Sequence, residues 1–389
     1  MNRSRSWKRL DGVDLLRGLA ILFVLLNHVN MRLRIARIPY AQGLPDQLVS
    51  SLVWNGQRGV QMFFAISGFL ITSTSIRRWG SLSKVRPRDF YALRFARIAP
   101  LLLALLTVLS LLHIFHIPYF IVPAKTGGLG RALAAAMTFH VNVLEASRGY
   151  LPGNWDILWS LSVEEMFYFF FPLVCVLLGR GKWLVAFLLM FAVLGPFART
   201  VWSKGNETWR EYSYLGGMDA IALGCLTALF TSARRISRPT LWALAAVGAG
   251  LLVLTLGFTN SLRTVGLEAT GLEMTIIAMA TCMIIAVSAK VGWNGGLALR
   301  PLLALGQCSY EVYLTHMFIV FVFFDWFLRL GKIVAFVPAL FVLVIAVAGS
   351  TGELVARWYS EPANRLLRRR LGDGADKLGS AIREAPNGL

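Results

Sequence analysis

The chain alternates long apolar runs with short polar connections over almost its whole length. A helix that spans a bilayer needs about 20 mostly apolar residues, and most of the runs are close to this length. The pattern therefore predicts an all-α fold, a polytopic membrane helical bundle of about ten transmembrane helices. The eleven apolar segments cover residues 13–31, 59–76, 98–117, 130–146, 158–179, 183–202, 215–232, 239–258, 270–289, 302–328 and 333–358.

Basic clusters between the runs orient the predicted helices. The positive-inside rule places such clusters in the cytoplasm, and the segments then alternate correctly if 130–146 does not cross. That segment is short and rich in small residues. We therefore predict ten crossings from the eleven segments, with both termini cytoplasmic. Arg32, Arg34 and Arg37 then fall outside, against the rule. The clusters are Arg3, Arg5, Lys8 and Arg9; Arg77, Arg78, Lys84, Arg86 and Arg88; Arg180 and Lys182; Arg234, Arg235 and Arg238; Lys290 and Arg300; and Arg365, Arg368, Arg369 and Arg370.

Composition supports a membrane protein and argues against a nucleic-acid partner. Of the 389 residues, 56% are hydrophobic and only 15% are charged, which is unusual for a soluble chain. The net charge of +19 comes from short clusters between apolar runs, as membrane topology requires. The four cysteines have no metal-ligand spacing, so no metal site is expected. We expect a membrane domain over 1–358, a short basic cytoplasmic tail over 359–389 and a multi-pass location in the inner membrane.

The first apolar segment carries two ionisable residues, Arg17 and His28, in the stretch DLLRGLAILFVLLNHVN. They are eleven positions apart, and eleven helical residues turn about 20° past three full turns. Both side chains therefore lie on one face, about 16 Å apart along the axis. Arg17 alone could be a snorkelling anchor, and His28 alone a packing residue. Together they indicate a functional face inside the protein, because ionisable groups are costly to bury in a membrane.

Polar groups also open the segment LWSLSVEEMFYFFFP, which contains Ser160, Ser162, Glu164 and Glu165. In the predicted topology this end faces outside, at a depth comparable to that of His28. A carboxylate there could orient the imidazole or stabilise its protonated form. The simpler alternative is a helix N-terminus, which favours acidic residues. We expect Glu164 to be the partner of His28, with Glu165 as the second choice, and Ser162 to contact the substrate.

Arg94 and Arg97 lie three positions apart in YALRFARIAP, at the inner end of the third segment. Such a pair suits phosphate recognition, because guanidinium groups bind phosphate oxygens in pairs. A positive-inside flank explains the two arginines equally well.

A polar stripe marks the tenth predicted crossing, in the stretch GQCSYEVYLTHMF. Ser309, Tyr313 and His316 follow one another at helical spacing on an otherwise apolar helix, and Glu311 lies off this stripe. We expect Tyr313 to contact the substrate and His316 to be the alternative chemical centre to His28.

Six motifs occur in order along nearly the whole chain, namely Arg-x10-His, FFAISGFLIT, Arg-x-x-Arg, WSLSVEEMFYFFFP, CSYEVYLTH and YSEPANR. In this order they resemble the acyltransferase 3 family of integral membrane acyltransferases. The resemblance implies a cytoplasmic acyl-CoA donor, usually acetyl-CoA. It also implies an acceptor hydroxyl on lipopolysaccharide, exopolysaccharide or a small glycoside. Met166 stands where the family commonly has Gln. The chain resembles the stand-alone members, which lack an additional esterase-like domain.

Carried over to this sequence, the resemblance implies that His28 and Arg17 are the essential pair, that Arg94 and Arg97 bind the donor, and that Glu164 is the motif glutamate. Because Arg17 also lies at an inner helix end, we expect it to bind the donor together with Arg94 and Arg97. Acyl-CoA would be a co-substrate, with no permanently bound cofactor. Its pantetheine arm could reach from cytoplasmic arginines to the imidazole of His28. His28 would act as general base on the acceptor hydroxyl or would take the acyl group itself, and the sequence leaves both open.

Two other classes of protein are consistent with part of the pattern. A transporter or flippase of a lipid-linked or glycosylated substrate also carries intramembrane charges. However, the two halves show no matched pair of Gly/Pro-interrupted helices, and the arginines cluster at one face. A purely structural membrane subunit would not need His28 or Glu164. An acyltransferase with acyl-CoA, a glycan or glycoside acceptor and the bilayer as partners is therefore the preferred interpretation.

Overall fold

The computed structural model describes residues 10–179 and 181–371, and the regular elements in this part of the chain are all helical. Among the described residues, ten helices are long and apolar enough to cross a membrane. The predicted all-α membrane bundle is therefore confirmed. The ten stretches are Asp11–Ile35, Asp46–Trp79, Pro87–Ile114, Gly153–Leu178, Lys182–Arg199, Glu207–Ala233, Arg238–Gly257, Leu272–Val291, Ser309–Arg329 and Val334–Leu371.

Several of these stretches combine a long helix with a short one. In chain order the α-helices are α1 (Asp11–Ile35), α2 (Asp46–Val53), α3 (Gly56–Trp79), α4 (Pro87–Ile114), α5 (Gly128–Met137), α6 (Val141–Arg148), α7 (Gly153–Asp156), α8 (Leu158–Leu178), α9 (Lys182–Arg199), α10 (Glu207–Tyr212), α11 (Tyr214–Ala233), α12 (Arg238–Gly257), α13 (Thr259–Thr264), α14 (Leu272–Val291), α15 (Arg300–Gln307), α16 (Ser309–Arg329) and α17 (Val337–Val355).

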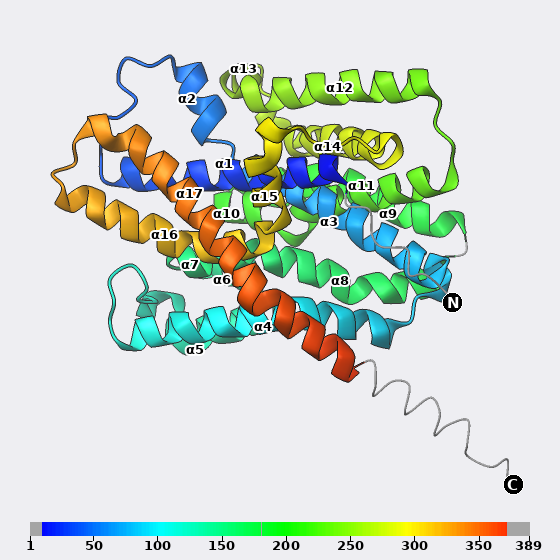
Figure 1. Ribbon diagram of the computed structural model, residues 1–389, viewed down its shortest axis with the longest axis horizontal. Coiled ribbons are helices and arrows are strands. Elements are labelled where there is room, and N and C mark those ends of the chain that lie inside the picture. Colours follow the sequence, from blue (N-terminus) through cyan, green and yellow to red (C-terminus); the bar gives the residue numbers. More distant parts are fainter. Residues whose placement is uncertain (1–9, 180, 372–389) are drawn as a thin grey trace, which may run out of the picture.

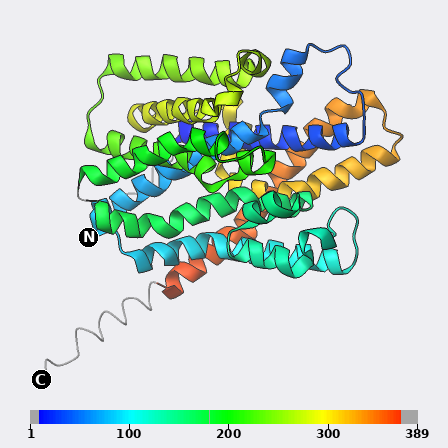
Figure 2. The ribbon, with the colours of Figure 1, turned by 180° about the vertical axis from the view of Figure 1, so that it is seen from behind.

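Most of the long helices run roughly alongside one another, α17 crosses them diagonally, and α1 lies near the middle of the bundle (Figure 1). Helix α12 runs along one edge of this view, and α4 and α5 run along the opposite edge. Seen from behind, the green helices between residues 158 and 233 lie in front (Figure 2). The helix that carries Arg17 and His28 is therefore inside the protein, as its two ionisable residues predict.

Helices α3 and α11 approach each other closely because small residues meet at their crossing. A Cβ atom added at Gly68 would lie 1.9 Å from the Ile221 carbonyl oxygen, and one added at Gly224 would lie 2.0 Å from that of Ala65. Without side chains at these two positions the backbones can touch, which is the usual way in which membrane helices gain packing contacts.

Buried ion pairs fix the same region of the bundle. Arg199 on α9 donates from Nη2 to Asp219 Oδ2 on α11 over 2.7 Å, and Gln61 on α3 donates to Asp219 Oδ1 over 2.8 Å. Arg58 on α3 pairs in the same way with Glu273 on α14. Because each charge has a partner and further hydrogen bonds, these residues hold four helices together and leave little capacity for a ligand.

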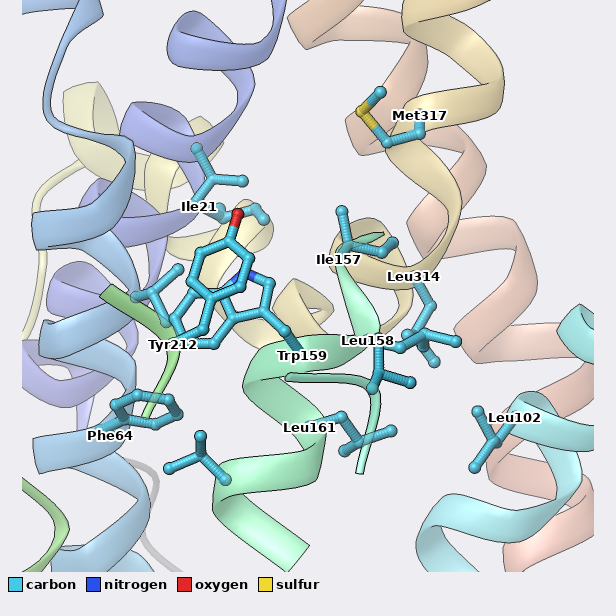
Figure 3. Packing of buried hydrophobic residues seen from close by; sticks show 14 of the residues in the cluster. Ile21, Phe64, Leu102, Ile157, Leu158, Trp159, Leu161, Tyr212, Leu314 and Met317 are labelled. Atoms are coloured by element: carbon cyan, nitrogen blue, oxygen red, sulfur yellow. The ribbon is translucent and has the colours of Figure 1, made fainter. Parts of the chain in front are cut away.

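Aromatic packing joins α8 to α10 on the side of the bundle that faces α3. The rings of Trp159 and Tyr212 are stacked, with centroids 4.1 Å apart and planes 3° apart, and Phe64 meets Trp159 edge-on (Figure 3). This packing fixes the start of α8 and thereby the position of the polar residues that follow it.

Residues 130–146 form two short helices, α5 and α6, and this stretch is not among the ten candidate spans. The break lies at Phe139, whose φ of 56° is left-handed and incompatible with a continuing right-handed helix. The structure therefore agrees with the prediction that this segment does not cross.

The last helix extends further than the hydropathy pattern indicates. After α17 the chain forms a π-helical turn at Ala356–Ser360 and then stays helical to Leu371. Pro362 lies two residues after the last residue of the wide turn, and such a turn accommodates a proline that cannot donate to the helix. The sequence predicts a tail from residue 359 onward because this stretch carries many charged residues. The basic cluster Arg3 to Arg9, Arg180 and the predicted tail beyond Leu371 lie outside the described residues.

Candidate active site

A cavity of about 360 Å³ lies between α1, α3, α4, α8 and α16. Its lining residues on α3 run from Val60 to Trp79, which is about 28 Å of helix at 1.5 Å per residue. The helix α3 and the last helix end on the same side of the bundle, and we call this side the basic end. The arginines that line the cavity are Arg17, Arg78, Arg94, Arg97 and Arg368.

Arg17, Arg94 and Arg97, which the sequence predicts to bind the donor, thus share one cavity. Arg368, from the last helix, lies within electrostatic range of Arg78 and Arg97. Three like charges at one mouth repel one another unless an anion lies between them. The basic end of the cavity is therefore suited to phosphate groups.

Arg94 neutralises the two glutamates of α8. Its Nη2 lies 2.6 Å from Glu165 Oε1 and 3.8 Å from Glu164 Oε1, and its guanidinium covers the ring of Tyr168 at 3.8 Å. The hydroxyls of Tyr168 and Ser67 both donate to Glu164 Oε1. Both carboxylates are therefore engaged at the wall of the cavity.

The recorded partners of Glu164 correct the expectation that it orients His28. On α3, Gly56 lies beside Asn27, the neighbour of His28, since a Cβ added there would lie 2.7 Å from Asn27 Cβ. Ser67, which contacts Glu164, is eleven residues further along α3, or about 16 Å. Glu164 lies beyond the first turn of α8, which runs toward the basic end. Its depth in the bundle is therefore nearer to that of Arg17 than to that of His28.

Arg97 and Arg17 are both held by α16. Arg97 Nη1 lies 3.1 Å from Glu311 Oε1, and the Glu311 side chain is 1% exposed. Arg17 donates from Nε to Ser309 Oγ over 3.0 Å and lies 3.9 Å from Asp14. Ser309, the first residue of the polar stripe of α16, therefore holds Arg17. Glu311 holds Arg97 although it lies off that stripe.

His28 faces a second histidine beyond the Tyr313 wall of the cavity, and the cavity lining in the described part of the chain includes neither of the two. The ring centroids of His28 and His316 are 5.1 Å apart. His316 is fully buried, and its Nδ1 lies 2.6 Å from the Tyr313 carbonyl oxygen, to which it donates. Its Nε2 has no hydrogen-bond partner among the described residues. In the neutral ring this Nε2 is a proton acceptor.

Tyr313 connects the histidine pair to the cavity. Its ring centroid is 5.8 Å from that of His316, and its hydroxyl lies 2.7 Å from Ser160 Oγ. Tyr313 and Ser160 both line the cavity. A molecule that fills the cavity from the basic end therefore reaches the wall behind which His28 and His316 lie.

Ser162 is placed differently from the expectation that it contacts substrate. It is buried, its hydroxyl donates to the Leu158 carbonyl oxygen over 3.0 Å, and the backbone N–H of Val141 donates to it over 3.2 Å. The cavity lining in the described part of the chain does not include it. The structure gives Ser162 a packing role, joining α6 to α8.

Comparison with known proteins identifies the family. The model of the acyltransferase 3 family, described as an acyltransferase domain, matches residues 10–352. The chain belongs to this family. It is 26% identical over 389 residues to the O-acetyltransferase OatA of Staphylococcus aureus (strain NCTC 8325 / PS 47), which covers 94% of this chain and 59% of that protein.

A second relative in this comparison is the peptidoglycan O-acetyltransferase OatA of Listeria monocytogenes. It is 23% identical over 330 residues, which covers 80% of this chain and 49% of that protein. The chain thus spans less than two thirds of the length of both relatives. No solved structure matches it.

Two kinds of site residue in this acyltransferase-family chain escape sequence reasoning. Glu311 is recognisable in the sequence, because a carboxylate in an apolar helix needs a partner. Helical spacing alone does not show that this partner is Arg97. Arg368 has no such signal, since it belongs to a basic segment that the sequence presents as a tail. Only the fold of the last helix brings it to the cavity that Arg17 lines.

Proposed function

We propose that this protein is a membrane O-acyltransferase that moves an acyl group, most simply acetyl, from acyl-CoA to a hydroxyl of a glycan. The observation that supports this most strongly is one cavity that is lined by five arginines and reaches the wall behind which the His28–His316 pair lies. The relatives, an O-acetyltransferase and a peptidoglycan O-acetyltransferase, favour an acetyl group and a cell-envelope polysaccharide.

The donor enters at the basic end of the cavity in this proposal. Arg78, Arg97 and Arg368 hold the phosphates of CoA, since guanidinium groups pair with phosphate oxygens. The pantetheine arm then lies along α3 toward Tyr313. Acyl-CoA is a co-substrate that leaves after each turnover, and no permanently bound cofactor is needed.

His28 removes the proton from the acceptor hydroxyl in this mechanism, because an imidazole can exchange a proton near neutral pH whereas Arg17 stays protonated. The hydroxyl oxygen attacks the thioester carbonyl carbon, a C–O bond forms and the C–S bond breaks. The CoA thiolate then takes the proton from the imidazolium. A variant of this route, in which His28 carries the acyl group as a nucleophile, has the same overall balance.

The glutamates have a supporting role in the proposed site. Glu164 and Glu165 hold Arg94, and Glu311 holds Arg97. The arginines are thereby fixed before the donor arrives, which reduces the entropy lost on binding. His316 lies next to His28 and is the alternative base, while Tyr313 positions the acyl end of the donor.

The proposed orientation places the basic end in the cytoplasm and the opposite end outside the inner membrane. Basic residues in short loops favour the cytoplasmic side. The donor is then taken from the cytoplasm and the glycan is modified on the outer face, so only the acyl end of the donor crosses the bilayer.

The proposed function is tested with the purified protein in lipid nanodiscs, radiolabelled acetyl-CoA and solubilised peptidoglycan glycan strands. We expect label to appear in the strands with wild type and not with His28→Ala. Absence of transfer by wild type, together with movement of a lipid-linked glycan across the bilayer, would instead support a transporter.

A further inference from the structure

The outer end of α1 carries a polar group that neither the donor cavity nor the proton transfer uses. Arg32 lies four residues after His28, so both side chains lie on the same face, with Arg32 about 6 Å further from the basic end. Its guanidinium lies 4.7 Å from the centroid of the Phe321 ring. The Nε of Arg32 is buried without a hydrogen-bond partner among the described residues.

An aromatic platform lies next to Arg32. Tyr119 stacks on Phe321, with centroids 5.0 Å apart and planes 8° apart, and the Tyr119 residue is 41% exposed. Its φ of 72° is left-handed, a conformation that costs free energy for a residue other than glycine. The fold therefore holds an open aromatic ring in place at this end of the bundle.

Helix α7 brings acidic and amide groups to the same place. A Cβ added at Gly153 would lie 3.4 Å from both Arg32 Nη2 and Phe321 Cζ, so the start of α7 touches the guanidinium and the platform. Asn154 follows, fully buried, and neither of its amide atoms has a partner among the described residues. Asp156 lies within electrostatic range of Arg32.

The charges at this end are nearly balanced. Burial and the neighbouring Asp156 raise the pKa of Glu145 well above its ordinary value, which disfavours its charged form. Asp156 accepts a hydrogen bond from the Tyr212 hydroxyl over 3.2 Å and supplies the counter-charge for Arg32. Because Arg32 already has this counter-charge, the site favours a neutral, hydroxyl-rich ligand over a phosphate or carboxylate.

We infer that Arg32, Tyr119, Phe321 and Asp156 form the subsite for one sugar ring of the acceptor, and this inference rests on the proposed function. The apolar C–H face of a pyranose packs on the exposed Tyr119 ring. Its hydroxyl oxygens accept from the guanidinium of Arg32, and its hydroxyl hydrogens are donated to the carboxylate of Asp156. The ring is thereby placed one helical turn from His28, with a further hydroxyl directed at the imidazole.

The experiment measures transfer from acetyl-CoA to solubilised peptidoglycan glycan strands by Arg32→Gln and Tyr119→Ala. Each variant should raise the KM for the strands about tenfold or more, as the loss of one charge-assisted hydrogen bond or one stacked ring predicts. The KM for acetyl-CoA should stay unchanged, because the donor cavity is untouched. Arg32→Lys should recover part of the affinity.

Arg34→Gln is the matched control. Arg34 is exposed, lies over Trp54 at 5.4 Å, and is about 200° around α1 from Arg32. It should leave both KM values unchanged. A purely structural role of Arg32 would lower the melting temperature and change both KM values together.

An unchanged KM for the strands in both Arg32→Gln and Tyr119→Ala would overturn the subsite while leaving the proposed function intact. If Arg32→Gln does not fold, Tyr119→Ala at its exposed position decides alone. Absence of transfer by wild type would refute the proposed function, and the subsite with it.

Discussion

The imidazole rings of His28 and His316 lie 5.1 Å apart, although one belongs to the first helix and the other to the second-last long helix. The Nδ1 of His316 is committed to the Tyr313 carbonyl oxygen, and this contact fixes the orientation of its ring. His28 has no comparable hydrogen bond within the part of the chain that the structure describes, and it keeps part of its surface accessible. His28 is therefore the imidazole that is free to meet an acceptor, with His316 as its fixed neighbour.

Arg97 is predicted to determine the affinity for the donor. Arg97→Ala should raise the Kd for acyl-CoA about tenfold or more, because charge-assisted contacts to phosphate are lost. Arg97→Lys should recover only part of this, since a single ammonium cannot bind two oxygens in a fork. Isothermal titration with acetyl-CoA measures the effect.

Two further variants separate phosphate binding from the loss of the Glu311 counter-charge. Arg88→Ala, at an exposed position of the same helix, should bind acetyl-CoA as wild type does. Arg97→Ala combined with Glu311→Gln should bind as weakly as Arg97→Ala alone. Restored affinity in the double variant would show that Arg97 acts through Glu311 and not on the donor.

The Arg94–Glu165 pair is predicted to stabilise the fold through charge balance. Arg94→Ala leaves two glutamates without their counter-charge, which should reduce the free energy of unfolding by about 3 kcal/mol. Glu165→Gln in the same chain should recover part of that loss. Thermal unfolding of the two single variants and the double variant in one detergent forms a double-mutant cycle. Strict additivity in this cycle would mean that the pair is not coupled.

The membrane fold was readable from sequence because apolar runs of spanning length and basic connections leave few alternatives. Arg17, Arg94 and Arg97 line the cavity, as a position inside the protein predicts for ionisable residues in apolar helices, and their role in binding the donor stays a prediction. The depth of Glu164 could not be read, because it depends on where α8 begins relative to α3. Arg368 could not be placed either, since only the π turn and the continued helix bring it to the cavity.

Glu145 is predicted to make stability depend on pH. Its raised pKa means that the folded state holds its proton more tightly than the unfolded chain. This stability is present below the ordinary Glu value of 4.5 and is lost as the pH rises through the folded-state pKa. Glu145→Gln removes the titration, so the melting temperature of the variant relative to wild type should increase as the pH rises above 4.5. A difference that is constant with pH would contradict this.

Loop accessibility tests the predicted topology. Cysteines introduced at Gly181 and Ser237 should resist a membrane-impermeant maleimide in intact cells, because both positions lie in predicted cytoplasmic loops. A cysteine at Gln42, in an exposed loop at the opposite end, should be labelled. The four natural cysteines are buried and should contribute little background. Labelling at Gly181 or Ser237 from outside would reverse the orientation.

The central claim is that His28 is the chemical centre, and single-turnover transfer by His28→Ala tests it most directly. The variant is loaded with radiolabelled acetyl-CoA in nanodiscs, and transfer to glycan strands is followed beside His316→Ala. Transfer by His28→Ala should fall by on the order of 10²-fold or more, as for loss of a general base. Its Kd for acetyl-CoA should not change, since Arg17 lies about 16 Å away along α1. Transfer within a few-fold of wild type by His28→Ala, with transfer abolished in His316→Ala, would contradict the account and assign the chemistry to His316.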